Sequence, residues 1–265
     1  MEAKEEPYPS SVTQQEWELV EPLLPKSGRL GRPPRYGRRV MLNAILYVVR
    51  SGCTWRMMPK EFPHWRLVYY YFAKWQAVGV WQQLNDALRD RVRRKAGKKK
   101  APTAAIIDSQ SVKMVSQPGE RGFDAGKKIN GRKRHLLVDT LGLILGCAVH
   151  HAGLQDRDGA KLLEPFLLRY GWLKAVFVDG GYAGRFLDWV ATLPRHRKLT
   201  ALVVKRIHAH RFVVLPKRWV VERTFAWLGN FRRLAKDYEV KTAHSEAMIY
   251  LAASALMLRR LAKSR

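Results

Sequence analysis

Residues 173–184 read LKAVFVDGGYAG, in which a short apolar segment runs straight into an aspartate. Residues 176–178 have the composition of a buried strand, and Asp179 follows them directly. An ionised carboxylate at the end of a buried strand loses hydration, so it requires a partner. The same pattern occurs in AAIIDSQSVKM, where residues 104–107 lead into Asp108. Two apolar strands are therefore predicted to end in an aspartate.

A third candidate carboxylate, Glu222, lies within LPKRWVVERTFAWLG, which has the apolar spacing of an amphipathic helix. Phosphodiester cleavage by two divalent ions, about 3.5–4 Å apart, requires hard oxygen ligands, and carboxylates from several elements can supply them. The long separations between Asp108, Asp179 and Glu222 leave room for intervening strands and helices. The pattern predicts a divalent metal site; the alternative is that the aspartates only cap helices or close turns.

The composition favours nucleic acid as the partner. The 265 residues include 49 Lys and Arg against 22 Asp and Glu, a net charge of +27, and 47% hydrophobic residues are enough for a core. No apolar run reaches the roughly 20 residues of a membrane span, and the acidic start MEAKEEPYPSS is unlike a signal peptide. Cys53 and Cys147 are isolated in the sequence, which suits a reducing cytosol. We expect a cytoplasmic, nucleoid-associated protein with no membrane segment.

The first part of the chain, residues 1–100, is predicted to be a small all-α domain. Helical patterns occupy residues 13–25, 37–52, 64–79 and 80–97, the last with an apolar stripe of Trp81, Leu84, Leu88 and Val92. A helix-turn-helix-like arrangement is possible around SGCTWRMMPKEFP, between the second and third helices. The alternative is a helical dimerisation or packing module.

The second part, residues 101–265, follows the linker RRKAGKKKAPT and alternates strands with helices. Strand patterns in TAAIIDSQSV, RHLLVDTLG and LILGCAVHH precede a helical segment at 156–171, a strand at 174–179, a helix, a strand, and the helix with Glu222. This order is that of an RNase H-like α/β domain. Asp139 is expected in a hairpin turn, and Asp156 and Asp158 at a helix N-terminus, so these three are left outside the metal site.

The chain resembles the bacterial insertion-sequence transposases with a DDE triad, specifically the insertion-sequence-five family. The motifs QDRDGA, VDGGYAG and LPKRWVVERTFAWLGNFRRLAKDYE carry the resemblance, which covers nearly the whole chain. It implies that Asp108, Asp179 and Glu222 are the catalytic triad, holding two Mg²⁺ ions, with Mn²⁺ as a possible substitute. It also implies binding to terminal inverted repeats of double-stranded DNA, cleavage of the element ends and strand transfer, by a homodimer or larger assembly.

Two basic segments are expected to contact the DNA backbone. GERGFDAGKKINGRKRH does not fit the phosphate-loop pattern, so no nucleotide cofactor is implied, and a basic loop is expected instead. The arm GRLGRPPRYGRR could lie in a minor groove. The alternatives are a solvated loop and a plain linker. The residues predicted to contact DNA are Lys127, Lys128, Arg132, Lys133 and Arg134 from the loop, and Arg32, Arg35 and Arg38 from the arm.

The helix with Glu222 departs from the family pattern. Related transposases often place a tyrosine seven and an arginine four residues before the glutamate, and a lysine seven after it. Arg218 matches, but Leu215 and Gly229 stand at the tyrosine and lysine positions. In a continuous helix, Arg233 returns to within about 20° of Glu222. We therefore expect Arg218 and Arg233 to bracket Glu222 and contact phosphates; the alternative is that Arg233 is solvated.

Two other functions compete with a transposase. One is a nuclease on the same fold, which hydrolyses DNA without joining ends and would fail a strand-transfer assay. The other is a DNA-binding regulator without catalysis, which three carboxylates within metal-binding reach would exclude.

Overall fold

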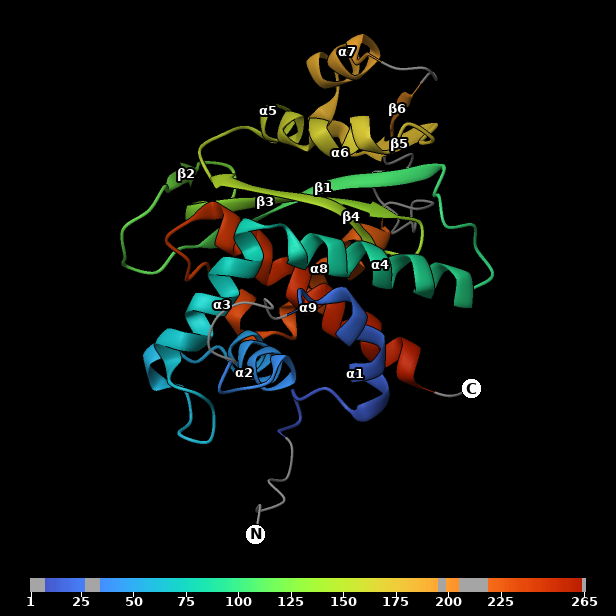
Figure 1. The fold of residues 1–265 in the computed structure, drawn as a ribbon. Helices are drawn as coiled ribbons and strands as arrows, with labels where there is room; N and C mark the ends of the chain where they lie inside the picture. Colours follow the sequence, from blue (N-terminus) through green and yellow to red (C-terminus); the bar gives the residue numbers. More distant parts are fainter. Residues whose placement is uncertain (1–7, 27–33, 195–198, 205–218, 264–265) are drawn as a thin grey trace.

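The computed structural model describes residues 8–26, 34–194, 199–204 and 219–263 (Figure 1). A mixed sheet lies at the centre, with short helices on one face and long helices on the other. The further N-terminal helices lie beyond the long ones (Figure 1). The predicted α/β architecture with a helical N-terminal region is confirmed.

The sheet begins as an antiparallel meander and continues with parallel strands. Its order is β4-β3-β1-β5-β6, and β2 also pairs with β3. β1 runs antiparallel to β3 but parallel to β5, and β5 runs parallel to β6. The described strands are β1 (Ala104–Lys113), β2 (Gly122–Asp124), β3 (Ile129–Asp139), β4 (Ile144–His151), β5 (Ala175–Val178) and β6 (Thr200–Val203).

Side chains along β1 alternate between two buried cores, because successive residues of a strand point to opposite faces. Ile106 belongs to the core shared with the long helices, whereas Ala105 and Ile107 belong to the core under the short helices. Both cores are fully apolar at these positions. This explains why the strand is a continuous apolar run rather than an alternating one.

The short helices are α5 (Asp156–Gly159), α6 (Glu164–Arg169) and α7 (Arg185–Thr192). The predicted single helix over 156–171 is wrong, since a 3-10 turn, Ala160–Leu163, interrupts it. Pro165 lies in the first turn of α6, where its missing N–H costs little. Asp156 and Asp158 do occupy the first turn of α5, as expected.

The long helices on the other face are α4 (Val80–Lys95), α8 (Trp219–Gly229) and α9 (Thr242–Ala262). The predicted apolar stripe of α4 is buried along its whole length, at Trp81, Leu84, Leu88 and Val92. α9 packs against both α4 and β4. Within the part of the chain that the structure describes, no helix has the length and apolar character to cross a membrane.

The N-terminal helices are α1 (Gln14–Val20), α2 (Arg38–Ser51) and α3 (Trp65–Ala77). Thr13 caps α1 in a capping box with Glu16. Gly52 ends α2 with a φ of 73°, a left-handed conformation that glycine adopts without strain. Residues 52–64 separate α2 from α3, a connection much longer than the turn of a helix-turn-helix motif.

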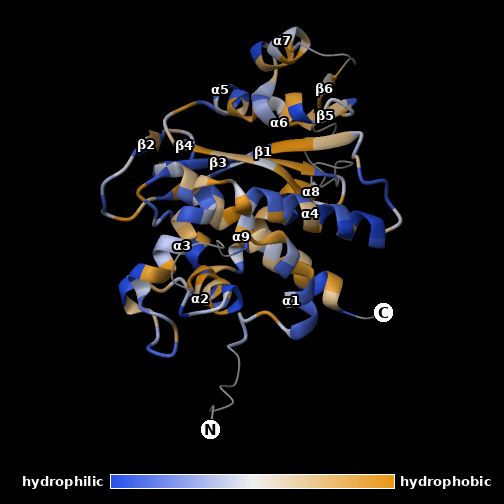
Figure 2. Cartoon of the chain, viewed as in Figure 1, coloured by the Kyte–Doolittle hydropathy of each residue, from blue (hydrophilic) through white to orange (hydrophobic). Residues whose placement is uncertain are grey.

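The N-terminal helices and the sheet share one hydrophobic core. A single apolar cluster includes Val20 of α1, Leu42 of α2, Ile106 of β1 and Leu251 of α9. In Figure 2 hydrophobic residues colour the central strands, and hydrophilic residues gather on the peripheral loops and the C-terminal end of α4. The helical part therefore packs on the sheet through extensive apolar contact.

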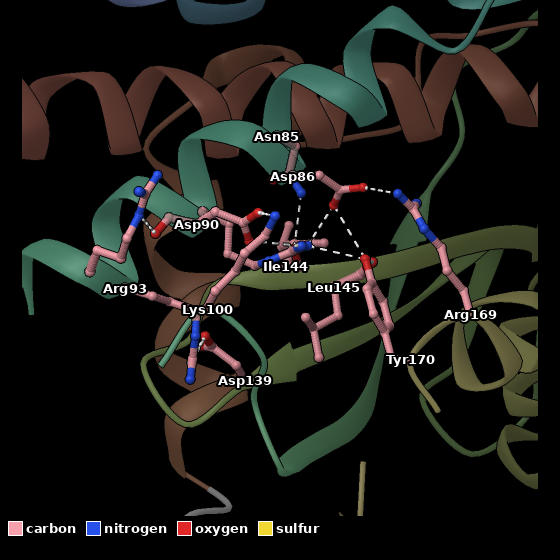
Figure 3. A network of polar contacts seen from close by, with 12 residues as sticks. Asn85, Asp86, Asp90, Arg93, Lys100, Asp139, Ile144, Leu145, Arg169 and Tyr170 are labelled. Atoms are coloured by element: carbon pink, nitrogen blue, oxygen red, sulfur yellow. Dashed lines mark hydrogen bonds and ion pairs between the residues drawn. The ribbon is translucent and has the colours of Figure 1, made fainter. Parts of the chain in front are cut away.

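Polar contacts join α4 to the hairpin between β3 and β4 (Figure 3). Asn85 Nδ2 and Arg89 Nη1 donate to the carbonyl oxygen of Ile144, at 2.9 and 3.2 Å. Arg93 forms an ion pair with Asp139, whose side chain is fully buried. Asp139 also accepts hydrogen bonds from the backbone N–H groups of Leu141 and Leu143. The predicted hairpin-turn role of Asp139 is confirmed.

Candidate active site

Asp108 lies midway along β1, and Asp179 directly follows the adjacent parallel strand β5. The prediction that a strand ends at Asp108 is wrong, because β1 continues to Lys113. The register between β1 and β5 pairs Ile106 with Phe177. Two residues further along both strands, the same register brings Asp108 opposite Asp179. Both carboxylates share the strand face of Ile106 and Phe177, which pack in the core under the long helices. The structure thus brings together two of the three predicted carboxylates.

Short backbone contacts orient both aspartates. Asp108 Oδ1 accepts a hydrogen bond from the backbone N–H of Ser109 at 2.7 Å. Asp179 Oδ1 accepts one from the backbone N–H of Gly181 at 2.9 Å, at the start of a 3-10 turn. Each aspartate is half-buried.

Glu222 lies on α8, which covers the same face of the sheet. Val221 and Phe225 of α8 belong to the apolar cluster that contains Ile106, and Glu222 itself is exposed. The alternation of buried and exposed residues follows from the amphipathic pattern of the helix. Asp108, Asp179 and Glu222 therefore come from two strands and a helix on one side of the sheet.

Two hydrogen bonds fix α8 on the turn between β3 and β4. Thr224 Oγ1 donates to the carbonyl oxygen of Gly142 at 2.9 Å, and Arg223 Nη2 donates to that of Leu141 at 3.0 Å. Gly142 has a φ of 80°, and a Cβ there would lie 2.7 Å from Thr224 Oγ1. The glycine thus permits the close approach that sets the position of α8 along the sheet.

The buried hydroxyl of Tyr182 reports the local charge. Burial raises its pKa well above the ordinary value, and the negative charges of Asp108, Asp156 and Asp179 raise it further. These three carboxylates, which come from both faces of the sheet, therefore all act on the Tyr182 hydroxyl. Such accumulated negative charge favours a cation.

The donor set fits a divalent cation in its chemistry, because carboxylate oxygens are the ligands that Mg²⁺ and Mn²⁺ prefer. Among the described residues, however, no three His, Cys, Asp or Glu side chains lie close enough to hold one metal ion. Three carboxylates within metal-binding reach would have excluded a non-catalytic DNA-binding regulator. The described residues do not meet this criterion. Asp108 and Asp179 are neighbours, and Glu222 stands on the helix beside them.

Asp156, outside the predicted triad, forms a polar cluster on the opposite face of the sheet. Its Oδ1 accepts from Ser109 Oγ at 2.9 Å and from Lys133 Nζ at 2.8 Å. Burial opposes ionisation of Asp156, but the contacts with Lys133 and Ser109 outweigh it and lower the pKa of the carboxyl. Asp156 is thus a permanently charged partner of Lys133. No sequence pattern indicates this pairing, because the two residues lie on different elements.

Three of the predicted DNA contacts are buried, and this prediction needs correction. Arg132, Lys133 and Arg134 belong to β3 rather than to a loop, and each is under 5% exposed. Arg132 forms an ion pair with Asp237 at 3.1 Å. Arg134 Nη1 donates to the carbonyl oxygen of Leu234 at 2.7 Å. Their positive ends are occupied within the molecule: Arg132 and Arg134 hold the C-terminal segment on the sheet, and Lys133 pairs with Asp156.

The expected bracket of Glu222 by Arg233 is also wrong. α8 ends at Gly229, and Arg233 lies in a separate 3-10 turn, so the helical angle does not apply. Arg233 is buried and pairs with Glu239 at 2.7 Å. It therefore has a structural role, and the alternative of a solvated arginine is wrong as well. Arg218, the other half of the bracket, lies outside the described residues.

The other predicted DNA contacts differ in exposure. Lys127 and Lys128 are exposed in the turn between β2 and β3. Arg35 is exposed, with its guanidinium 5.4 Å from the ring centre of Tyr36. Arg38 instead starts α2 and pairs with Glu21 at 3.1 Å. Arg32 lies outside the described residues. Lys127, Lys128 and Arg35 remain candidates.

Sequence comparison supplies the family. Residues 12–85 match a family model described as "Putative transposase of IS4/5 family", and residues 99–258 match one described as "Transposase DDE domain". The chain belongs to the IS4/5 family of DDE transposases. The RNase H-like fold and a DNA substrate follow from that membership. All three predicted carboxylates of this transposase fall within the DDE domain.

Two curated relatives support the assignment. The transposase is 35% identical over 109 residues to the insertion element IS402 uncharacterized 16.2 kDa protein of Burkholderia cepacia, covering 37% of this chain and 70% of the relative. It is 30% identical over 69 residues to the uncharacterized protein y4sN of Sinorhizobium fredii (strain NBRC 101917 / NGR234), covering 26% of this chain and 55% of that protein. No solved structure matches the chain significantly.

Proposed function

We propose that the chain binds the terminal inverted repeats of an insertion sequence, cleaves the element ends and joins the 3′-hydroxyl to target DNA. The observation that carries the proposal is the register of the parallel strands β1 and β5, which sets Asp108 of β1 against Asp179 after β5, beneath the helix with Glu222. A DDE transposase requires carboxylates from separate elements at one site, and the position of these two aspartates under α8 supports such a site. The large positive charge of the chain supports a polyanionic substrate.

Within this proposal Asp108 and Asp179 hold two Mg²⁺ or Mn²⁺ ions, and Glu222 completes the second site. The chemistry that bound ions supply is activation of the attacking water or 3′-hydroxyl and stabilisation of the leaving oxygen. The protein's own part is to orient the carboxylates, through the N–H groups of Ser109 and Gly181, and to hold α8 in place. A rigid, correctly placed ligand set lowers the barrier because the reactants need not find their geometry by chance.

DNA binding is assigned to exposed cations on both parts of the chain. Lys127, Lys128 and Arg35 contact phosphates, and the helical part, residues 1–100, binds the element ends. A homodimer or larger assembly brings two ends together. Each phosphate contact releases counterions, so affinity falls steeply as the salt concentration rises.

The test is cleavage of a duplex carrying the element end by Asp108→Asn, Asp179→Asn and Glu222→Gln variants in Mg²⁺. Each change removes one negative charge and one ligand, so cleavage falls by roughly a thousandfold or more, about 4 kcal/mol in the barrier. DNA binding stays intact or tightens, because repulsion of phosphate decreases. The matched control is Asp188→Asn, at an exposed position on α7, which keeps full activity. Cleavage near the unmodified rate would remove that residue from the triad.

A further inference from the structure

The outer face of α8 carries a stack of alternating aromatic and cationic side chains. Trp219, Arg223 and Trp227 are spaced by four residues and so lie along one side of the helix. The guanidinium carbon of Arg223 lies 4.4 Å from the ring centre of Trp219 and 4.4 Å from that of Trp227. Arg260 of α9 lies 4.1 Å from the ring centre of Trp227 and ends the stack.

The stack is fixed to the body of the protein rather than free in solvent. Arg223 Nη2 donates to the carbonyl oxygen of Leu141, and the stack continues onto α9 through Arg260. Burial lowers the pKa of Arg223, whereas the negative charge of Asp139 raises it. Trp219 is the outermost member and remains 41% exposed, with Arg223 covering one side of its indole. A large aromatic surface is therefore rigidly displayed.

Trp219 lies close to the candidate catalytic glutamate. Three residues separate Trp219 from Glu222 on α8, which corresponds to about 4.5 Å along the axis and about 60° around it. Any ligand that stacks on the indole is thereby brought beside Glu222. Packing on Arg223 covers only one side of the Trp219 ring. The stability of the helix alone therefore does not explain why the other side is exposed to solvent.

We propose that Trp219 is a stacking platform for the terminal base at a cleaved DNA end; the inference rests on the proposed function. Aromatic side chains stack on bases of any sequence, because every base has a π-face. Within an intact duplex both faces of each base are covered by its neighbours. Cleavage creates a strand end whose last base has an open face. The exposed indole beside Glu222 matches this face and would hold the cleaved end for the joining step.

The positive charges around the platform fit the same ligand. Arg223 and Arg260 lie behind the indole, where they attract the phosphates next to the terminal base. An apolar or basic partner would gain nothing from these two cations.

The experiment measures binding of the full chain, in EDTA to prevent cleavage, to two probes of one sequence. The first is a short blunt duplex with 2-aminopurine as the terminal base, and the second is the same duplex closed at both ends by non-nucleotide linkers. Trp219→Ala is expected to weaken binding of the open duplex by about 5- to 150-fold, the range of one base stacked on an aromatic ring. Binding of the closed duplex stays the same, and the change in 2-aminopurine fluorescence on binding is lost.

Two variants control for folding and for general loss of an aromatic residue. Trp219→Phe keeps a ring at the position and is expected to restore most of the preference for open ends. Trp172→Ala removes a tryptophan of similar exposure, 38%, next to α6, and is expected to change nothing. Equal loss on both probes, or no loss with Trp219→Ala, would overturn the proposal. Failure of the unsubstituted chain to bind either probe would contradict the proposed function as well.

Discussion

The guanidinium of Arg132 is fully buried and bound by acceptors from the C-terminal segment. It pairs with Asp237, and it donates to the carbonyl oxygens of Glu239 and Val240 at 2.6 and 2.7 Å. A buried charge is tolerable only with such a complete set of partners. Arg132 thereby fastens the segment that follows α8 to strand β3, so it positions the helix that carries Glu222.

Arg132→Ala is expected to destabilise the protein by about 3–5 kcal/mol, because Asp237 is left buried without a counter-charge. Lys127→Ala, in the same basic segment but exposed, is expected to change stability by less than about 0.5 kcal/mol. It should instead lower the slope of log affinity for DNA against log salt by about 0.9. Urea unfolding and salt-dependent DNA binding of the two variants separate these roles. A stable Arg132→Ala protein with weak DNA binding would restore Arg132 as a DNA contact.

At the scale of elements, α9 places the carboxyl group of Glu246 against strand β4. Glu246 Oε1 accepts a hydrogen bond from the backbone N–H of Val149 at 3.0 Å. Burial raises the pKa of Glu246 to about 7, above its usual value near 4.3. The folded state therefore holds the proton more tightly than the unfolded state between these two values. Ionisation of Glu246 opposes folding as the pH rises through this window.

Glu246→Gln keeps the hydrogen bond to Val149 and removes the ionisation. Below about pH 4.5 the carboxyl is protonated in both states, so the variant and the natural protein should be similarly stable there. Above about pH 7 the variant should be more stable by about 3 kcal/mol, the equivalent of the pKa shift. Denaturant unfolding across this pH range measures the difference. A constant difference between the two proteins would contradict the buried-carboxyl account; the exposed Glu18→Gln variant should give such a constant difference.

The elements that the sequence predicted are those with a clear apolar pattern. The four N-terminal helices, β1, β4 and β5 follow from periodicity. The apolar runs located Asp108 and Asp179, but only Asp179 follows the end of its strand. The first half of β3 was missed because Arg132, Lys133 and Arg134 resemble a solvated loop. Their burial depends on acceptors such as Asp237 and Asp156, which are distant in the sequence. Charge pairing between remote segments leaves no local pattern, so sequence periodicity could not reveal it.

The candidate site was predictable at its two aspartates but not around Glu222. Asp108 and Asp179 come together because β1 and β5 are parallel neighbours whose register pairs Ile106 with Phe177, a pairing that the sequence order of an RNase H-like domain supports. The surroundings of Glu222 were not predictable beyond Gly229, where the helix ends. The stack on α8 had a visible signal, since Trp219, Arg223 and Trp227 are spaced by four residues in WVVERTFAW.

At the scale of the whole molecule, the helical part and the sheet form one body. α4 joins them through apolar packing, through the Arg93–Asp139 ion pair and through the carbonyl of Ile144 (Figure 3). The turn that receives α4 also holds α8 through Leu141 and Gly142. DNA bound by the helical part is therefore connected, through one hairpin, to the helix that carries Glu222. A rigid link of this kind would align a bound end with the carboxylates.

The measurement that tests the account most directly is strand transfer of a pre-cleaved element end into plasmid DNA by the full chain in Mg²⁺. The account predicts joined products with the natural protein and with the Asp188→Asn control, and none with Asp179→Asn, although all three bind the end. Cleavage without joining by the natural protein would indicate a nuclease. Joining by Asp179→Asn at the natural rate would contradict the assignment of the adjacent aspartates as the catalytic centre.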